Sequence, residues 1–388
     1  MPLDKSELQS VISSVRTLVR EVVVPAEDEI EDQDSVPSRI REQAADMGLF
    51  GFALPEEYGG LGLSAVEEAH LAFEIGWTTP AFRSMFGTNN AIAGQVIVQS
   101  GTDEQRKEHL PRMASGEVVA SFALTEDEAG SDASGLRTRA VYDGEGGYVI
   151  NGSKQYITNS PVAGLLVVFA RTESDSASQV SAFLVDAQVP GVEVGPRDKK
   201  MGQSGAISAP MTFTDVHVGP EALLGGVEGR GLQHAMGALN RGRLHVAALC
   251  VGLADRLLYE SVAYAEGRRQ FGHPIADFQL VQAMLARSAA TRHACRALVL
   301  DACAAFDAGL PTTIELASSA KLLATEMVGE VADRAVQIHG GMGYMRGTAV
   351  ERFYRDARLY RIYEGTSEIQ LLAIAKQVRR RHQLHGAD

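Results

Sequence analysis

The sequence predicts an α+β protein with an N-terminal helical domain, a middle antiparallel β-barrel or sandwich, and a C-terminal helical bundle. Three observations predict this order. Apolar residues recur every three or four positions up to about residue 114. Short apolar runs separated by Gly, Pro, Asn and Asp follow, without helical patterns between them. Long helical patterns return after residue 232. The expected domains are 1–117, 118–232 and 233–388.

The first domain is expected to be helical throughout. Apolar residues recur at helical spacing from Leu8 to Val22, and Pro25 ends that run. A second helical pattern covers 40–50, a turn-rich break follows at 54–62, and helical patterns then resume.

The middle domain is expected to hold short strands. A strand-like run covers 118–124, and the apolar pairs at 141–142 and 148–150 flank a Gly-rich turn, which is a hairpin signature. Further strands are expected at 165–170, 180–185, 192–194 and 211–218. Because no helix separates them, a dinucleotide-binding fold of alternating strands and helices is not expected.

The last domain is expected to be a bundle, because long helices joined by short loops pack antiparallel. Helical spacing covers 232–269, 278–308, 313–339 and 367–384. Ser367 and Gln370 fit a capping box, which predicts where the last helix begins.

Composition excludes several classes of protein. The 388 residues carry 36 basic and 49 acidic side chains, a net charge of −13, which is not typical of a nucleic-acid binder. The three cysteines show no CxxC spacing, so a reducing compartment is expected, and no zinc-protease motif or other metal site is evident. No apolar run approaches the roughly 20 residues of a membrane span, and the N-terminus lacks signal-peptide features. A cytoplasmic location is expected.

Four segments could bind a ligand, although each also has an ordinary structural explanation. Small and hydroxyl residues at 125–132 follow a strand and could approach a phosphate or a ring edge, or form a plain turn. Tyr156 and Thr158 could line a site for a planar ring. Arg268, at a helix end, could complement the helix dipole or bind a phosphate. The glycines at 340–343 exceed what a helix cap requires.

Glu364 is the candidate general base. It lies between two expected helices, beside the aromatic face formed by Phe353, Ala357 and Tyr360. A carboxylate beside aromatic side chains can be a base with an elevated pKa. The alternative is an exposed glutamate in a loop.

Taken together, six segments resemble the acyl-CoA dehydrogenase family, flavoenzymes that convert acyl-CoA to trans-2-enoyl-CoA. They are LPEEYGG (54–60), ALTEDEAGSD (123–132), NGSKQYITN (151–159), RRQFG (268–272), QIHGGMGY (337–344) and YEGTSEIQ (363–370). They span nearly the whole chain in the family's order. The resemblance implies a helical domain, a β-domain and a four-helix bundle.

The resemblance implies FAD as the cofactor. The positions that match flavin contacts are Phe122, Leu124, Thr125, Ser131, Tyr156, Thr158, Thr366 and Glu368. Many relatives have Trp where this chain has Tyr156. Three more positions match residues that reach the FAD of a neighbouring subunit in a homotetramer: Arg268, Gln270 and Phe271. Gln337, Gly340 and Gly341 match residues near the adenine half of FAD, and Gln279 is a further expected cofactor contact.

The resemblance also implies Glu364 as the base that removes the α-proton, with FAD as hydride acceptor and an electron-transfer flavoprotein as partner. Some members carry the base on a bundle helix instead, at the position that is Gly242 here. The positions that match acyl-CoA contacts are Ser131, Asn240, Arg243, Tyr363 and Gly365. In the family, the main-chain N–H of the base residue and a ribityl hydroxyl of FAD stabilise the thioester enolate.

Three alternatives stay open. Phe82-Arg83-Ser84 resembles the segment of glutaryl-CoA dehydrogenases that places Arg at the acyl end, so Arg83 could bind a dicarboxylyl-CoA, with decarboxylation to follow, or be structural. An acyl-CoA oxidase would use the same base, but oxidases are usually longer. A non-enzymatic scaffold would not need an intact Glu364. Acyl length and branching are not encoded in any motif.

Overall fold

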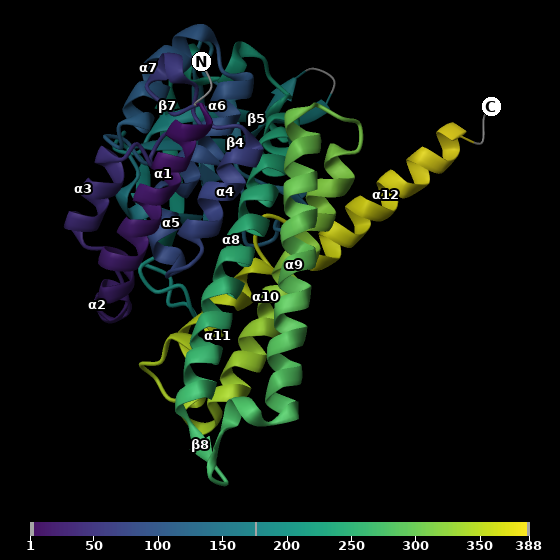
Figure 1. Cartoon of the computed structure of the whole chain (residues 1–388). Coiled ribbons are helices and arrows are strands. Elements are labelled where there is room, and N and C mark those ends of the chain that lie inside the picture. Colours follow the sequence, from purple (N-terminus) through teal and green to yellow (C-terminus); the bar gives the residue numbers. More distant parts are fainter. Residues whose placement is uncertain (1–3, 175–176, 386–388) are drawn as a thin grey trace.

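The computed structural model describes residues 4–174 and 177–385. Figure 1 shows helices at the N-terminal end, a sheet in the middle of the chain and long helices after it. This order confirms the predicted succession of helical, β and helical parts. The domain limits at residues 117 and 232 stay a prediction.

The N-terminal part consists of helices with side-chain caps at several starts. Capping boxes open three of them, through Asp4 with Glu7, Ser64 with Glu67, and Thr102 with Gln105. The helices are α1 (Lys5–Leu18), α2 (Glu27–Gln33), α3 (Ser38–Asp46), α4 (Ala65–Ile75), α5 (Pro80–Asn90), α6 (Ala93–Ser100) and α7 (Asp103–Ala114). The prediction that Pro25 ends the first helical run is wrong. The α-helix stops at Leu18, a π-turn (Val19–Val23) and a 3-10 turn (Val24–Ala26) follow, and α2 begins directly after them at Glu27.

The middle part is one seven-stranded sheet. Its strands are β1 (Ala120–Ala123), β2 (Arg139–Tyr142), β3 (Tyr148–Thr158), β4 (Leu165–Ser174), β5 (Ala177–Asp186), β6 (Val192–Val194) and β7 (Ser208–Val218). The predicted hairpin is confirmed, because β2 and β3 pair antiparallel. β4 is buried on both faces: Leu165, Val167 and Phe169 face one apolar cluster, and Leu166, Val168 and Ala170 face another.

Two details of the predicted β-domain are wrong. The sheet is not wholly antiparallel, because β4 runs parallel to both β1 and β2. It is not a closed barrel either, since no ladder joins β5 to β6 among the described residues. The start of α8 lies against β5 instead: a Cβ on Gly231 would stand 2.7 Å from the carbonyl carbon of Ser181. Turn signals locate strands, but they do not determine strand order or closure.

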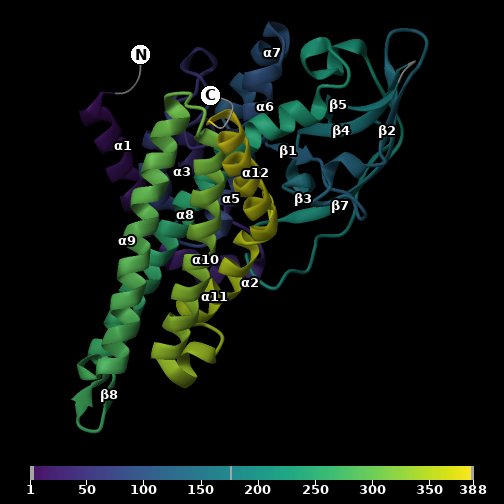
Figure 2. The same cartoon turned by 90° about the vertical axis from the view of Figure 1, so that its right-hand side faces the viewer.

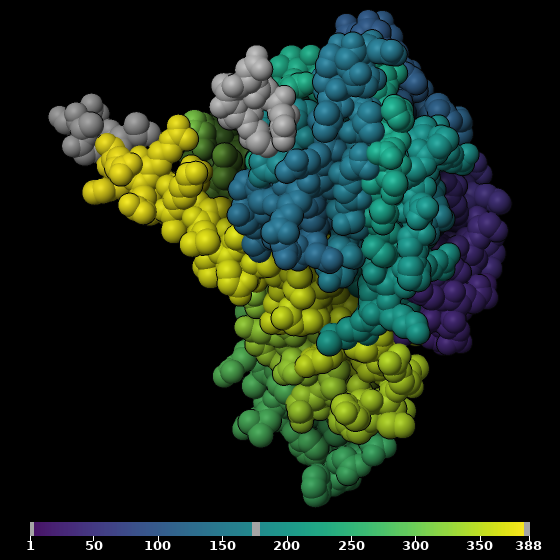
Figure 3. Space-filling view, turned by 180° about the vertical axis from the view of Figure 1, so that it is seen from behind, coloured from purple at the N-terminus to yellow at the C-terminus, as the bar shows by residue number. Residues whose placement is uncertain are grey.

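The C-terminal part is built on three long helices, α8 (Gly231–Gly267), α9 (Gln279–Asp307) and α10 (Thr313–His339), followed by α11 (Ala349–Tyr360) and α12 (Ser367–His385). A two-stranded ribbon of β8 (Arg269–Gln270) and β9 (His273–Pro274) joins α8 to α9. Figure 2 shows α9 and α10 running side by side. α12 leaves the body of the molecule, as Figures 1 and 3 show.

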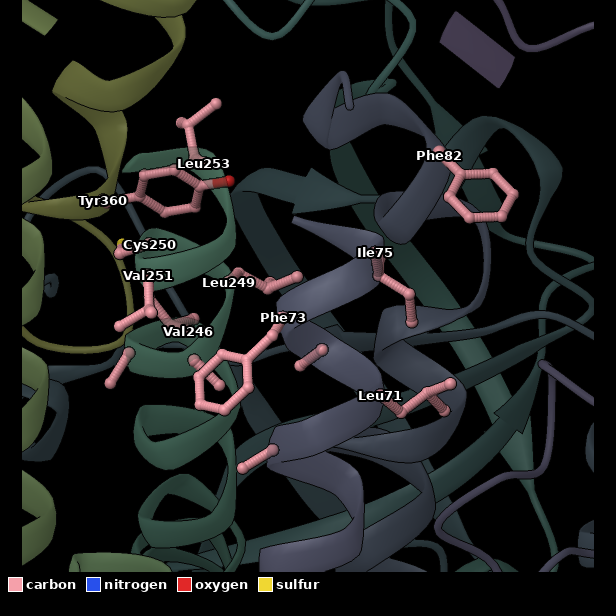
Figure 4. Packing of buried hydrophobic residues seen from close by; sticks show 14 of the residues in the cluster. Leu71, Phe73, Ile75, Phe82, Val246, Leu249, Cys250, Val251, Leu253 and Tyr360 are labelled. Carbon is pink, nitrogen blue, oxygen red and sulfur yellow. The ribbon is translucent and has the colours of Figure 1, made fainter. Parts of the chain in front are cut away.

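The helical parts share one core because α4 and α8 cross at close range. Figure 4 shows apolar side chains of α4 and α8 between the two helices. Glycines permit this approach: a Cβ on Gly252 would lie 2.2 Å from the Phe73 carbonyl oxygen, and one on Gly76 would lie 2.3 Å from that of Leu249. This crossing holds α8, which carries part of the candidate site, against the N-terminal helices. No helix in the described part of the chain is long and apolar enough to cross a membrane.

Candidate active site

A cavity of about 250 Å³ lies where α5, β1, β3, the first turns of α8 and the loop before α12 meet. Most of the predicted flavin and substrate residues line it. They are Arg83, Phe122, Leu124, Thr125, Ser131, Tyr156, Thr158, Arg243, Tyr363, Glu364 and Gly365. Segments as far apart in the sequence as Arg83 and Gly365 therefore converge on one site.

Glu364 is not an exposed loop residue, because its side chain is only 8% exposed. Its backbone is left-handed, with φ of 53°, and Gly365 follows at 89°. Oε2 of Glu364 has no hydrogen-bond partner among the described residues. The carboxylate lies directly against α8, where a Cβ on Gly242 would come within 2.3 Å of Oε2. Only glycine at position 242 leaves room for the carboxylate in this position.

Two buried donors hold the backbone of this loop. Nε2 of Gln370 donates to the carbonyl oxygens of Glu364 (3.2 Å) and Gly365 (3.0 Å). Nζ of Lys321, on α10, donates to the same Gly365 oxygen at 2.7 Å. A left-handed conformation at a non-glycine residue costs about 1–2 kcal/mol, so it needs this kind of external support.

The last helix begins at Ser367, as predicted, but the expected capping box is wrong. Thr366 caps the helix, with its hydroxyl accepting from the N–H of Ile369 at 3.3 Å. The Ser367 hydroxyl instead donates to Glu326 at 2.6 Å, and Gln370 is engaged by the loop carbonyls. The sequence pattern could not show these competing partners.

Two arginines line the cavity together with Glu364. Nη2 of Arg83, on α5, lies 3.7 Å from Oε1 of Glu364, and Nε of Arg83 is buried without a partner in the described structure. Arg243, on α8, is 8% exposed and donates to Oδ1 of Asn240 at 3.1 Å. Burial lowers the pKa of Arg243, and the charge of Glu364 opposes that shift. These incompletely paired cations suit an anionic or strongly polar ligand.

An aromatic side chain of β3, that of Tyr156, lines the same cavity as Glu364. The register of β3 against β7 shifts between Lys154 and Ile157, and Tyr156 takes a φ of 59° at this bulge. Its side chain is 68% exposed although it lines the cavity. Bulges redirect side chains next to functional sites. Tyr156 and Thr158 therefore form one wall of the cavity, as the sequence predicts.

A buried ion pair supports the neighbouring strand end. Nζ of Lys154 lies 2.7 Å from Oε1 of Glu126 and donates to the Leu124 carbonyl at 3.2 Å. Burial lowers the pKa of Lys154 to about 8, while Glu126 acts in the opposite direction. The same carboxylate accepts from the N–H and hydroxyl of Thr138. The backbone that carries Leu124 and Thr125 is thereby fixed.

Several predicted residues lie elsewhere. Arg268, Gln270, Phe271 and Gln279 are at the far end of the α8–α9 hairpin, near the β8 label in Figure 1. Gln337, Gly340 and Gly341 end α10 close by, since the rings of Tyr264 and His339 stack at 4.2 Å. None of these seven residues lines the cavity of this chain, and Phe271 is 91% exposed. Thr366 and Glu368 also lie outside the lining.

Sequence reasoning missed part of the site. Gly87, Thr88 and Ile92 line the cavity from α5 and the turn after it, and Met236, Leu239 and Ile369 line it from α8 and α12. These small and apolar residues carry no motif. Lys321 had a detectable signal, since it is a lone charge on the apolar stripe of α10. The described residues contain no group of three or more His, Cys, Asp or Glu able to hold a metal ion.

Family models match three consecutive stretches of the chain. The N-terminal, middle and C-terminal domains of acyl-CoA dehydrogenase match residues 5–117, 121–216 and 229–379, respectively. The chain belongs to the acyl-CoA dehydrogenase family. It is an oxidoreductase of that family, and the family's three-part fold is the one described above.

Similar proteins of this family include both dehydrogenases and reductases. The chain is 38% identical to the probable acyl-CoA dehydrogenase YngJ of Bacillus subtilis, over 96% of this chain and 98% of that protein. It is 41% identical to an acryloyl-CoA reductase (NADH) of Anaerotignum propionicum, over 92% and 90%. It is 38% identical to a subunit of the caffeyl-CoA reductase–Etf complex of Acetobacterium woodii, over 92% and 93%.

Solved structures in the family agree with the fold. Butyryl-CoA dehydrogenase of Megasphaera elsdenii matches with a TM-score of 0.90 and 31% identity, covering 97% of this chain and all of that one. An acyl-CoA dehydrogenase of Bacillus anthracis, solved in complex with FAD, matches with a TM-score of 0.90 and 34% identity, covering 98% of this chain and 68% of that one. A glutaryl-CoA dehydrogenase in complex with glutaryl-CoA matches with a TM-score of 0.89 and 32% identity, covering 97% of this chain and 95% of that one.

Proposed function

We propose that the chain catalyses flavin-dependent α,β-dehydrogenation of an acyl-CoA thioester to the trans-2-enoyl-CoA. The observation that carries this proposal is the buried carboxylate of Glu364, held against Gly242 and facing the same cavity as Tyr156 and Thr158. A base on one side and an aromatic, hydroxyl-lined wall on the other match the needs of α-proton removal beside a planar cofactor.

The residues present fit FAD. Thr125, Ser131 and Thr158 bring hydroxyls to the cavity, and Tyr156 offers an exposed ring to a planar group. The solved Bacillus anthracis relative contains FAD, which supports the same cofactor here. When bound, FAD supplies the acceptor for the hydride that leaves the β-carbon.

The protein's own part in the reaction concerns the α-carbon. Glu364 takes the α-proton, and its main-chain N–H is the donor proposed for the thioester oxygen as negative charge develops there. Such a donor contributes about 10²- to 10³-fold to rate. Arg243 and Tyr363 border the thioester end, and Ser131 borders the pantetheine. Run in reverse, the same carboxyl returns the proton to the α-carbon, as reductases of the family require.

The remaining predicted residues are proposed to complete a cofactor site in a neighbouring copy. The hairpin residues Arg268 to Phe271 and the end of α10 lie together, exposed, and away from this chain's own cavity. A homotetramer would bring them to a second subunit's FAD. The Etf-linked relative supports an electron-transfer flavoprotein as the electron acceptor.

A dicarboxylyl-CoA is the second candidate substrate. Arg83 is 11% exposed, lines the cavity and keeps Nε unpaired in the described structure. Gly87 makes room for it, because a Cβ there would lie 2.6 Å from Nε. A carboxylate at the end of a short acyl chain would satisfy this guanidinium. The alternative is that Arg83 pairs only with the carboxylate of Glu364 and does not contact the substrate.

The test is a flavin-reduction screen with purified, FAD-loaded protein. Straight acyl-CoAs of increasing length, branched acyl-CoAs and glutaryl-CoA are mixed anaerobically, and flavin absorbance is followed. We expect one of these classes of acyl-CoA to bleach the flavin rapidly. In Glu364→Ala and Glu364→Gln the rate of flavin reduction should fall by several orders of magnitude, with FAD still bound. The exposed Glu193 of β6 provides the control E193Q. Near-normal bleaching in the Glu364 variants would contradict the assignment.

The same screen separates the alternatives. Turnover of glutaryl-CoA that Arg83→Met abolishes would establish the dicarboxylyl substrate, and no turnover of that ester would remove it. Peroxide formed with acyl-CoA in air would indicate an oxidase. A colourless protein that cannot be loaded with FAD would indicate a scaffold.

A further inference from the structure

We propose that Lys321 is a positioning residue for the base: its ammonium group holds the loop that carries Glu364 and supplies a positive charge beside the carboxylate. This inference rests on the proposed function of Glu364. It starts from an unusual placement, since the Lys321 side chain is completely buried in α10. Lysine is almost never fully buried unless it is paired.

The geometry directs this lysine at the catalytic loop. Within the described structure, Nζ of Lys321 donates a hydrogen bond to the carbonyl oxygen of Gly365, at 2.7 Å. That carbonyl already accepts from Nε2 of Gln370 at 3.0 Å. A neutral side chain at position 321 would therefore leave no buried carbonyl without a donor. Hydrogen bonding alone does not explain why a charged group stands there.

The charges around Lys321 explain better why a cation stands at this position. Burial lowers the pKa of Lys321 from 10.5 to about 8, and Glu364 is the strongest group acting in the opposite direction. Cys250 on α8 and Glu326 on α10 also raise it, and Arg243 on α8 lowers it. From α12 the facing group is the neutral amide of Gln370. The ammonium therefore interacts with the base while lying behind it, away from the cavity lining.

This position separates the role of Lys321 from those of the two arginines. Arg83 and Arg243 line the cavity, where a bound ligand would compete for them. Lys321 does not line it, so its charge stays beside the carboxylate throughout the reaction. A cation in this place favours the ionised base before proton transfer, and its hydrogen bond restrains the left-handed backbone of residues 364 and 365.

The test compares wild type with Lys321→Met, which keeps the length of the side chain and removes charge and donor. The control is Thr325→Val, one turn along α10, where a buried hydroxyl donates only to the Leu322 carbonyl. FAD-loaded proteins are mixed with the acyl-CoA that the screen above selects, across pH 5.5–9.5. Flavin content and melting temperature are measured in parallel.

We expect K321M to retain flavin and to melt at or above the wild-type temperature near pH 7, because a costly buried charge is gone. Its rate of flavin reduction should fall roughly 10- to 100-fold. The basic limb expected near pH 8 in wild type should vanish.

Three results would overturn the proposal: an unchanged rate and pH profile, an equal loss in T325V, or a lower melting temperature with a pH-independent loss of rate, which indicates structural support alone. If no acyl-CoA reduces the flavin of the wild-type protein, the proposed function is overturned, and the role of Lys321 with it. If the wild type is active and K321M reduces flavin at the same rate, only the role of Lys321 is overturned.

Discussion

Gly242→Ala is the sharpest single test of the geometry around Glu364. The added Cβ would lie 2.3 Å from Oε2 of Glu364, whereas contacts under 3.0 Å are essentially never found for real Cβ atoms. The carboxylate must therefore retreat by about 0.7 Å. Because a misplacement of about 1 Å in a catalytic group can cost about 10²-fold, we expect a loss of roughly 10- to 100-fold in the rate of flavin reduction.

Stability should respond in the opposite direction. Gly is about 1 kcal/mol less favourable than Ala inside a helix, and Gly242 lies inside α8. G242A should therefore melt at or above the wild-type temperature while losing activity. The control is Gly237→Ala on the same helix, where the new Cβ meets only Oε1 of the flexible Gln99 side chain, at 2.9 Å.

A double-mutant cycle identifies the cause of the loss. Glu364→Asp withdraws the carboxylate by one methylene, so the Cβ at position 242 no longer collides with it. The cost of G242A should then be much smaller in the E364D background than in wild type. Equal costs in both backgrounds, or full activity in G242A, would refute the placement of the base against α8.

Two further predictions concern buried charges away from the cavity. Glu27 is 4% exposed and is surrounded by Thr78, Arg256 and Arg352. Glu27→Ala should lower the free energy of unfolding by about 1.5–3 kcal/mol in chemical denaturation, and an unchanged free energy would contradict this. Two buried arginines each lose one carboxylate partner, although Arg256 keeps Glu260 and Arg352 keeps Asp28. Burial raises the pKa of Asp356 to about 7. The folded chain therefore keeps that proton up to pH 7 while the unfolded chain releases it near pH 4, so Asp356 destabilises the fold increasingly over that range. Asn cannot ionise and still accepts from the Gln203 N–H, so D356N should gain roughly 2–4 kcal/mol on wild type between pH 4 and 8, and a constant difference would contradict the reasoning.

Local periodicity was sufficient for the helices of the C-terminal part. The expected helix over 313–339 has the same limits in the structure, and the one expected over 232–269 spans Gly231–Gly267. Those helices are long, and packing against neighbours enforces the same apolar stripe along their length. The sheet was harder to predict, because β4 returns parallel to β1 across 41 intervening residues. Pairing between distant strands leaves little trace in a local pattern.

The candidate site likewise contains residues that local motifs identify and residues that only the fold brings to the cavity. Motifs identified Glu364, Tyr156 and Arg83, which the structure brings to one cavity. They could not identify Thr88 or Met236, whose contribution depends only on where α5 and α8 lie. The alternative of an exposed loop glutamate is wrong, because α8 and α10 bury that loop, and their packing cannot be inferred from the loop's own sequence.

The distribution of charge is compatible with the proposed binding of an anionic CoA ester by a chain whose net charge is −13. Within the cavity lining the sign is reversed, since Arg83 and Arg243 face a single carboxylate, that of Glu364. Lys321 adds a third positive group from behind. In the proposed reaction Glu364 loses its negative charge when it accepts the α-proton, and the same cations are left facing an enolate. Under this proposal the site stabilises charge where it develops, and removing any one cation should affect the transition state more than binding.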